Sequence, residues 1–279
     1  MSGVAILGAG NLGRALATGW VRAGLFDAGE IALTRRDSDK LHDLAESGHP
    51  VGSDNAATVR SADVIVLAVQ PQQLHALLEE IGTSLEPERH RVISVASGVS
   101  IGQIRDALVS SAAGIASATS VPVVRAMPNT AVSIGESMTC LCSDGGSDDA
   151  LAEAVGMFEA VGRTLVIEEE MMVPATALCA CGVAFFLRCV RAASQGGIEI
   201  GFHPEDALLL AAQTAKGAAA LALEEDTHPE GEIDRVTTPR GCTIAGLNEM
   251  EHQGLSSAMI RGITVSARAA AGLHRPATD

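Results

Sequence analysis

Residues 4–20 read VAILGAGNLGRALATGW, and this stretch decides the predicted fold of the first half of the chain. An apolar strand ending at Leu7 leads directly into Gly8, Gly10 and Gly13, and a helix-like sequence follows. The G-x-G-x-x-G spacing between a strand and a helix is typical of a dinucleotide-binding turn, because it lets a pyrophosphate approach the backbone amides at the helix N-terminus. A glycine-rich turn that binds nothing is the alternative, and the flanking strand and helix favour the binding turn.

Beyond this turn, short β-branched runs alternate with helix-like stretches as far as residue 168. This alternation predicts a parallel sheet wrapped by helices, so residues 1–168 are expected to form a Rossmann-type, doubly wound α/β domain. Strands are predicted at 4–7, 31–34, 63–69, 91–96, 121–127, 137–141 and 164–167.

From residue 171 onward the strand pattern stops, and the spacing of alanine, leucine and isoleucine becomes helical. Residues 169–279 are therefore expected to form an all-helical domain, with Gly201 and Gly254 as helix stops. Helices are predicted at 171–199, 204–225, 243–251 and 256–271. The long polar interruption at 226–242 is the predicted functional loop.

The end of the second predicted strand reads LTRRDSDK, residues 33–40. Dinucleotide folds that prefer NAD usually place an acidic residue here to bind the ribose hydroxyls. Arg35 and Arg36 occupy that place instead, and two guanidinium groups suit the 2′-phosphate of NADP. The sequence therefore predicts NADPH, while Asp37 keeps NAD possible.

The composition narrows the range of partners and of compartments. The formal net charge of −15 argues against nucleic acid and against an anionic membrane surface, since both require a concentrated basic face. No uninterrupted apolar run spans a bilayer and no secretory signal begins the chain, so a soluble, cytoplasmic protein is expected. Six cysteines are expected as reduced thiols, and the Cys-x-Cys pairs at 140/142 and 179/181 as packing residues rather than metal ligands.

The available proton donors favour reduction of a C=N bond. The chain contains no tyrosine, and its lysines are Lys40 and Lys216. Reduction of a ketone usually requires a proton donor of that kind, whereas a cyclic imine can arrive already protonated. Lys216, or a histidine at 203, 228 or 252, remains a possible acid.

Several separate stretches together resemble the pyrroline-5-carboxylate reductase family along essentially the whole chain. They are GAGNLG at 8–13, AVQPQ at 68–72, VRAMPNTA at 124–131, CGVAFFL at 181–187, AAQTAKGAA at 211–219 and VTTPRGCTIAGLNEMEHQG at 236–254. The last stretch is the most specific. The resemblance implies reduction of 1-pyrroline-5-carboxylate to L-proline, a helical substrate-binding domain that interlocks with its twin, and a homodimer or an oligomer built from dimers. No metal is expected.

The resemblance also assigns residues to the site. Gly8, Gly10, Asn11 and Leu12 match the pyrophosphate turn, and Ala68, Val69, Gln70 and Pro71 match the segment that passes the cofactor. Met127, Pro128 and Asn129 match the stretch that faces the nicotinamide and substrate. Gly241, Cys242 and Thr243 match the turn whose amides bind the substrate carboxylate, with Thr243 as the catalytic residue near the ring nitrogen. Asn55 and Val236 complete the predicted cofactor and substrate sets.

The chain departs from the family pattern at several of these positions. Gln70 stands in place of a usual lysine, Ala131 in place of a proline, and residues 179–183 differ from the typical Ser-Gly-Ser-Gly-Pro. Arg240 replaces the first glycine of the turn, and glycine tolerates backbone conformations that arginine resists. Two other functions stay open: a β-hydroxyacid dehydrogenase, with Lys216 on its pocket wall, and a catalytically silent homologue that binds NADP.

Overall fold

The computed structural model describes residues 3–111, 120–146, 148–224 and 226–272. Contacts divide the chain into two compact units. Met1–Cys181 together with Ser266–Asp279 forms the first unit, and Gly182–Val265 forms the second. The domain boundary expected at residue 168 stays a prediction.

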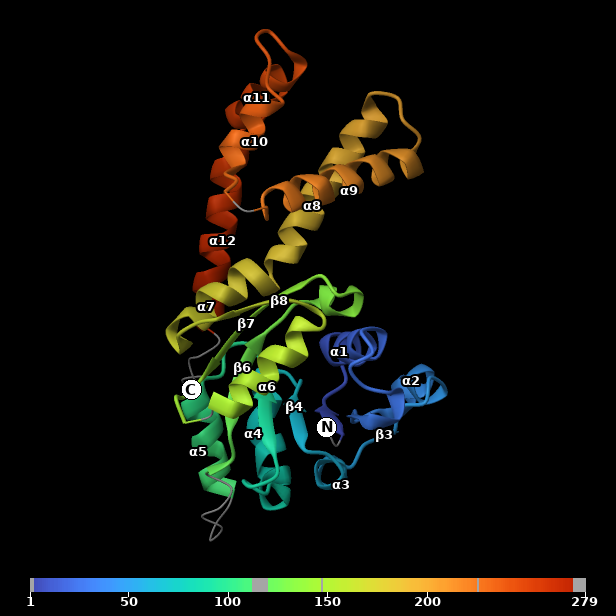
Figure 1. Cartoon of the computed structure of the whole chain (residues 1–279), viewed down its shortest axis with the longest axis vertical. Coiled ribbons are helices and arrows are strands. Elements are labelled where there is room, and N and C mark those ends of the chain that lie inside the picture. The colour runs from blue at the N-terminus through green and yellow to red at the C-terminus, as the bar shows by residue number, and fades with distance from the viewer. Residues whose placement is uncertain (1–2, 112–119, 147, 225, 273–279) are drawn as a thin grey trace. The chain divides into compact units, whose positions relative to one another are not determined.

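The first unit is built on an eight-stranded sheet with the order β3-β2-β1-β4-β5-β6-β7-β8 (Figure 1). Its strands are β1 (Val4–Leu7), β2 (Ile31–Thr34), β3 (Val51–Gly52), β4 (Val64–Leu67), β5 (Arg91–Ser94), β6 (Val123–Met127), β7 (Ser137–Ser143) and β8 (Gly162–Val166). Neighbouring strands pair in parallel except β6 and β7. The predicted Rossmann-type fold class is therefore confirmed.

Two features of the sheet differ from the sequence prediction. The short strand β3 was not predicted, because Val51–Gly52 is too short to show an alternating pattern. Strand β7 runs antiparallel to β6 instead of continuing the parallel sheet. The connection between them, residues 128–136, is too short for the crossover that a parallel strand requires, so the chain reverses direction.

Helices cover both faces of this sheet. They are α1 (Asn11–Arg22), α2 (His42–Glu46), α3 (Asn55–Arg60), α4 (Pro71–Ile81), α5 (Ile101–Ser111) and α6 (Asp148–Glu159). One core cluster joins α1 and α6 to the sheet through Trp20 and Phe158, whose rings pack edge to face. The other joins α4 and α5 through Leu78 and Ile104. Alternate residues of each buried strand enter opposite clusters, as expected for a sheet that is covered on both sides.

The strand order predicts where a ligand-binding crevice would lie in this unit. The chain leaves β1 toward β2 on one side, and β4 lies on the other side of β1. In open α/β sheets, ligands bind beyond the carboxyl ends of the strands at such a reversal of strand order. The segments that follow β1, β2 and β4 meet at this edge of the sheet.

After β8 the chain becomes helical, as predicted. Helix α7 (Met172–Ala175) passes into a π-helical turn at Thr176–Ala180, which closes with a hydrogen bond from the Cys181 amide to the Thr176 carbonyl (2.9 Å). Such wide turns are rare and are frequently found at functional sites.

In the second unit, the described residues form helices joined by loops and turns. It contains α8 (Gly182–Glu199), α9 (Pro204–Leu221), α10 (Pro229–Arg235), α11 (Cys242–His252) and most of α12 (Leu255–Gly272). Gly201 and Gly254 follow helices and have positive φ angles, which confirms them as stops. The prediction of a loop at 226–242 was wrong for 229–235. Pro229 opens α10 there, and the His228 ring accepts a hydrogen bond from the Glu230 amide (3.2 Å).

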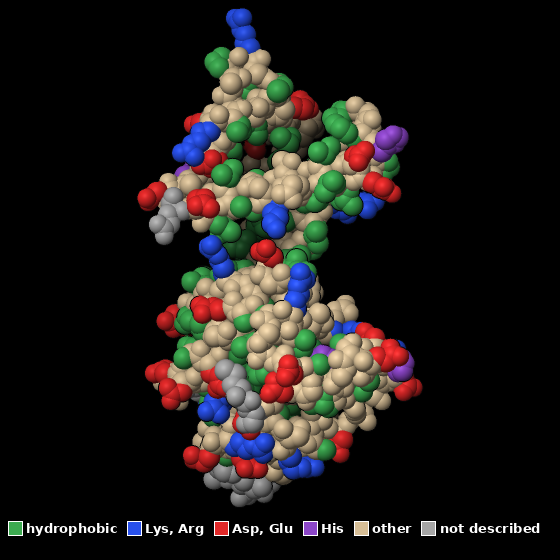
Figure 2. All heavy atoms as spheres, turned by 45° about the vertical axis from the view of Figure 1, so that its right-hand side comes forward, with side chains coloured by type: hydrophobic (Ala, Val, Ile, Leu, Met, Phe, Trp, Pro, Cys, Tyr) green, Lys and Arg blue, Asp and Glu red, His purple; other side chains and the backbone are tan. Residues whose placement is uncertain are grey.

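Large apolar side chains of the second unit are exposed in the single chain. Figure 2 shows green side chains distributed over these helices, and they include Phe186, Leu187, Ile200, Leu209 and Ile260, each at least 60% exposed. By length and composition, the helical stretch Glu169–Glu199 is apolar enough to cross a membrane, although charged residues interrupt it. An apolar surface of this extent indicates a partner surface or an apolar environment.

Candidate functional site

The glycine turn, residues 8–13, is held tightly against the end of β2. The amides of Gly8 and Ala9 both donate to the Thr34 carbonyl, at 3.1 and 2.8 Å, and the Gly10 amide donates to the Gly8 carbonyl at 2.7 Å. Gly8 has a φ of 91°, and a Cβ there would overlap the Val69 side chain and lie 2.9 Å from the Val69 amide. Both the conformation and the close approach of Val69, in the segment after β4, therefore require glycine at this position.

The first turn of α1 leaves its amides available to a ligand. Gly10 is the N-cap and has no side chain to cap the helix, and no acidic residue occupies the first turn. The first three amides of a helix have no intrahelical partner and carry partial positive charge. Asn11 is exposed and Leu12 half-buried beside them. This geometry fits a pyrophosphate.

Two arginines follow β2 at the rim of the glycine turn. Arg35 is half-buried and lies over the turn, with its Nη1 3.4 Å from the Ala9 carbonyl oxygen, whereas Arg36 is exposed. Asp37 forms an ion pair with Lys40, with Nζ and Oδ2 3.1 Å apart. The one carboxylate that could replace the missing acidic residue thus has a cationic partner, while the arginines lie beside the turn.

The segment after β4 lies against the glycine turn. The Ala68 amide donates to the Leu7 carbonyl (2.8 Å), and the half-buried Val69 packs against Gly8. Gln70 is the exposed N-cap of α4, and Pro71 is its first helical residue. The structure therefore brings Ala68 and Val69 against the glycine turn, and Gln70 and Pro71 follow them at the start of α4.

Asn55 lies in the same region, but its side chain is already occupied. Its Oδ1 accepts from the Thr34 hydroxyl (2.6 Å), and its Nδ2 donates to Glu80 Oε2 (3.0 Å). These bonds join the end of β2 to α4. The structure therefore shows Asn55 as a support of the crevice, and direct contact with a cofactor stays a prediction.

The stretch that ends β6 and continues beyond it, residues 127–129, is buried in the first unit. Met127 is 2% exposed and belongs to the core, and Pro128 is buried next to it. The side chain of Asn129 accepts from the Ala131 amide (2.9 Å) and donates to the Cys179 carbonyl (3.2 Å). Asn129 thus connects its own loop to the π-helical turn.

Sequence reasoning missed Arg125, a buried charge within β6. Its Nη1 donates to Glu169 Oε1 (3.0 Å), and the same oxygen accepts from the Ile101 amide (2.7 Å). An arginine is rarely fully buried unless it is paired. Because Arg125 lies within an otherwise apolar strand, VVRAM, its position in the sequence was the available signal. This ion pair fastens the segment that follows β8 to the sheet.

In the second unit, residues 238–243 form what we call the Pro-Arg turn. The Gly241 amide donates to the Thr238 carbonyl (2.9 Å), and Arg240 has a φ of 61°. A Cβ on Gly241 would overlap Thr238 Oγ1 and lie 3.0 Å from the Thr238 carbonyl oxygen. The arginine therefore occupies the left-handed conformation that favours glycine, while Gly241 is needed for space.

Helix α11 begins earlier than the sequence suggested. Gly241 is its N-cap, whereas the sequence pattern predicts a helix that starts at Thr243. The prediction was wrong because the turn is completed by Arg240, so Gly241 is already extended and Cys242 already helical. Thr243 consequently lies within the first turn, half-buried, and Cys242 is exposed.

The start of α11 also leaves its amides uncapped. Gly241 provides no side-chain cap, and no acidic residue lies in the first turn, which begins with Cys242, Thr243 and Ile244. A carboxylate can accept hydrogen bonds from such amides and gains from the helix dipole. Val236, 64% exposed, ends α10 just before the turn.

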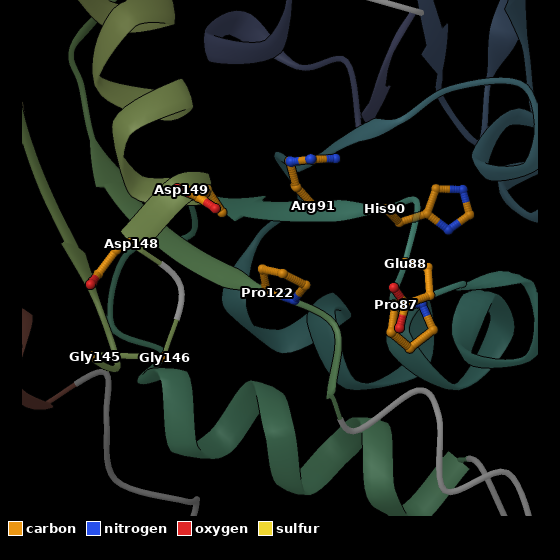
Figure 3. A pocket seen from close by; sticks show the side chains of 10 residues that line it. Pro87, Glu88, His90, Arg91, Pro122, Gly145, Gly146, Asp148 and Asp149 are labelled. Atoms are coloured by element: carbon orange, nitrogen blue, oxygen red, sulfur yellow. The ribbon is translucent and has the colours of Figure 1, made fainter.

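A pocket of about 540 Å³ lies elsewhere on the first unit (Figure 3). It is lined by the start of β5 at Arg91, by Pro122 before β6, and by Asp148 and Asp149 of α6. These are the amino ends of the strands, so the pocket opens at the sheet edge opposite the glycine turn. No predicted site residue lines it.

Comparison with known families matches both halves of the chain. A family model described as pyrroline-5-carboxylate reductase dimerisation matches residues 169–273, and one described as NADP oxidoreductase, coenzyme F420-dependent, matches residues 3–98. The first covers the helices that carry the exposed apolar side chains.

Individual relatives agree with these matches. The chain is 50% identical to pyrroline-5-carboxylate reductase 1 of Dictyostelium discoideum over 98% of its own length, but it spans only 50% of that relative. It is 46% identical to pyrroline-5-carboxylate reductase 2 of the same organism, with coverage of 95% of this chain and 90% of the relative. The crystal structure of Plasmodium falciparum pyrroline carboxylate reductase with NADP bound has the same fold, with a TM-score of 0.86, 22% identity and 98% coverage of both chains.

Proposed function

The chain belongs to the pyrroline-5-carboxylate reductase family, and we propose that it reduces 1-pyrroline-5-carboxylate to L-proline with NADPH. This reaction would make it an NADP-dependent oxidoreductase acting on a C=N bond in the final step of proline synthesis. The structural observation that carries the proposal is the uncapped start of α11, with Thr243 in its first turn. The family relationship, the glycine turn and the absence of tyrosine from the chain support it.

NADPH is proposed to bind at the crevice of the first unit. Gly8, Gly10, Asn11 and Leu12 would receive its pyrophosphate, and residues 68–71 would form the opposite wall. Arg35 and Arg36 would bind the 2′-phosphate through charge-assisted hydrogen bonds. The fit rests on the amides at the start of α1, on the space that Gly8 leaves beside Val69, and on the NADP that the P. falciparum relative binds. NADPH would supply the hydride for the carbon of the imine.

Each unit contains residues that we propose to bind the substrate. In the second unit, the amides of Gly241, Cys242 and Thr243 would face the substrate carboxylate, with Val236 as an apolar neighbour. In the first unit, the loop of Met127, Pro128 and Asn129 would border the substrate through its backbone, since these side chains are buried. Asn55 would support the cofactor crevice through Thr34.

Thr243 is the proposed catalytic residue. In the iminium form the ring nitrogen is already protonated, so its N–H would donate a hydrogen bond to the Thr243 hydroxyl oxygen, and this bond would orient the ring. Hydride then adds to carbon, and the electron pair of the C=N bond remains on nitrogen as the amine of proline. Rate acceleration would come mostly from orientation and electrostatics, because no covalent intermediate is needed.

The assembly is proposed to be a homodimer or an oligomer of dimers. The dimerisation match over 169–273 and the exposed apolar residues of α8 and α9 support a contact between copies of the chain. We also propose that the chain is soluble and located in the cytoplasm.

The alternative of a β-hydroxyacid dehydrogenase requires a lysine on the wall of the substrate pocket. Lys216 is exposed on α9, and the relatives found share the reductase name. The reductase is therefore favoured. A silent NADP-binding homologue would keep the crevice but not catalyse turnover, and Arg240 in the substrate turn is the feature that motivates this alternative.

The deciding experiment measures NADPH oxidation at 340 nm with 1-pyrroline-5-carboxylate and, separately, NADP reduction with a set of 3-hydroxyacids. We expect an imine-dependent rate with formation of L-proline and no hydroxyacid-dependent rate. NADPH binding, measured by fluorescence titration, distinguishes the outcomes. Binding without turnover identifies a silent homologue, and hydroxyacid turnover identifies the dehydrogenase.

A further inference from the structure

Two cysteines that are distant in the sequence lie in contact in the first unit. The Sγ atoms of Cys140 and Cys179 are 3.6 Å apart. Cys140 lies in β7, and Cys179 lies in the π-helical turn. Each comes from a different Cys-x-Cys pair, so the sequence pattern could not show that they meet. Both thiols are free in the structure.

We propose that Cys140 and Cys179 form a reversible dithiol–disulfide site, which closes when the chain meets a peroxide and reopens with a thiol reductant. The site is a local feature of the first unit. It is not part of the predicted reductase chemistry, and the family pattern at residues 179–183 does not include it.

The geometry allows the bond to form with a small movement. A disulfide has an S–S length of about 2.05 Å, so the sulfur atoms must approach by roughly 1.5 Å. Cys140 is held on both sides, paired with Met127 of β6 and with Leu165 of β8. Cys179 lies in a single wide helical turn between α7 and α8. We therefore expect most of the movement to occur at Cys179.

The two thiols have different chemical roles. The hydrogen bond from the Cys140 thiol favours the thiolate of Cys179 and lowers the pKa of Cys179 below the ordinary thiol value. Cys179 is also half-buried, whereas Cys140 is 3% exposed. Burial raises the pKa of the neighbouring Cys142 to about 11. Cys179 is therefore the nucleophile and Cys140 the resolving thiol.

The reaction with hydrogen peroxide balances in two steps. The Cys179 thiolate attacks one peroxide oxygen, the O–O bond breaks, and hydroxide leaves while Cys179 becomes a sulfenic acid. The Cys140 sulfur then attacks the Cys179 sulfur, and the S–O bond breaks. The oxygen leaves as water with the proton of the Cys140 thiol. Two thiols are oxidised to one disulfide, and one peroxide is reduced to two molecules of water.

Closure of the bond has a consequence for the proposed active site. The Cys179 carbonyl accepts the hydrogen bond from Asn129 Nδ2, and Asn129 in turn holds the Ala131 amide. Movement of Cys179 therefore disturbs the loop that follows β6. This part of the inference rests on the proposed function, and it predicts that the oxidised chain has lower turnover.

The test treats the full-length chain with a small molar excess of hydrogen peroxide and then blocks the remaining thiols with an alkylating reagent. We expect intact mass spectrometry to show that four of the six cysteines are alkylated. Peptide mapping should find one cross-linked pair, Cys140–Cys179, which disappears after dithiothreitol. These readouts do not depend on enzymatic activity.

Variants separate this pair from its neighbours. Cys179→Ser and Cys140→Ser should each abolish the cross-link, whereas Cys181→Ser, two residues away, should retain it. If the chain reduces 1-pyrroline-5-carboxylate, a second readout is its turnover. Oxidation with peroxide should then lower kcat at least threefold in the wild-type chain and in Cys181→Ser, but not in Cys179→Ser. A disulfide that joins any other cysteines, or peroxide-treated wild-type chain in which both Cys140 and Cys179 remain alkylatable, would overturn the proposal.

Discussion

The two turns that begin α1 and α11 both lead into a glycine N-cap, but they differ in the left-handed residue that precedes it. Both helices have an extended glycine as N-cap, Gly10 with φ −80° and Gly241 with φ −75°, and neither has a side-chain cap or an acidic residue in the first turn. Before the first helix, the left-handed residue is Gly8, with φ 91°. Before the second, it is Arg240, with φ 61°.

A helix start elsewhere in the first unit shows what an ordinary cap looks like. Asp54 precedes α3, and its carboxylate accepts from the Ala57 amide (2.8 Å). A carboxylate in that place satisfies the amides and repels an anion. The absence of such a cap at α1 and α11 therefore costs stability and leaves room for an anionic ligand. The difference between the two turns lies in what surrounds them, because the glycine turn is enclosed by β2 and β4 whereas Arg240 is exposed.

The glycine turn tolerates substitution less well than the Pro-Arg turn, because neighbouring segments enclose it. Gly8→Ala therefore has the largest expected effect. The left-handed conformation and the overlap with Val69 together cost about 2–5 kcal/mol. We expect NADPH affinity to fall at least a hundredfold and the thermal midpoint to drop. Fluorescence titration and differential scanning calorimetry measure these changes.

Gly24→Ala is the matched control for that variant. Gly24 also has a positive φ, 70°, but a Cβ there meets nothing within 4 Å. It should therefore lose stability through backbone strain alone, with NADPH affinity unchanged. Equal loss of affinity in the two variants would mean that strain, rather than the approach of Val69, governs the cofactor crevice.

The fold of the first unit could be predicted because its strands are short, apolar and separated by clear turns. Strands β1 and β2 have the predicted bounds, 4–7 and 31–34. The direction of β7 could not be predicted from its own residues, since it depends on the length of the preceding connection. Helix α10 was missed because proline, glutamate and glycine at 229–231 look like a loop until the capping contacts are known.

The parts of the candidate site that depend on backbone conformation could be predicted from the sequence. The side-chain contacts could be predicted less well. The glycine turn follows from residue spacing alone, and it is found where expected. The buried side chain of Met127, the contact between Asn55 and Thr34, and the Arg125–Glu169 pair depend on which elements pack together. The contact of Cys140 with Cys179 is of the same kind, because a π-helical turn brings them together and sequence periodicity does not predict one.

In the Pro-Arg turn, the substitution Thr243→Val removes the hydroxyl and preserves the shape of the side chain. We expect kcat/KM for 1-pyrroline-5-carboxylate to fall at least tenfold, while the Kd of NADPH changes by less than twofold, because the cofactor residues lie in the other turn. Thr243→Ser should restore most of the activity. A valine variant with normal turnover would remove Thr243 from the mechanism and leave only the amides of α11.

Arg36→Ala tests whether the arginines beside the glycine turn bind the 2′-phosphate of NADPH. Loss of one charge-assisted hydrogen bond to the 2′-phosphate should raise the KM for NADPH about fivefold and leave the KM for NADH nearly unchanged. Arg22→Ala, at the far end of α1, removes the same charge away from the crevice and should change neither constant. If both variants weaken NADPH binding equally, net charge rather than a specific phosphate contact determines the preference.

The smallest effect is expected for substitutions of Arg240, the left-handed residue of the Pro-Arg turn. Arg240→Gly relieves a left-handed arginine and should stabilise the chain by about 0.5–1 kcal/mol, a rise of about 2 °C in Tm. Arg240→Ala keeps a Cβ and loses the charge, so it should not gain this stability. Because Arg240 is exposed and precedes the amides of α11, the KM for 1-pyrroline-5-carboxylate should change by less than twofold in both. A similar rise of KM in both variants would instead show that its charge attracts the substrate carboxylate, and the arginine would then be retained for binding at the expense of stability.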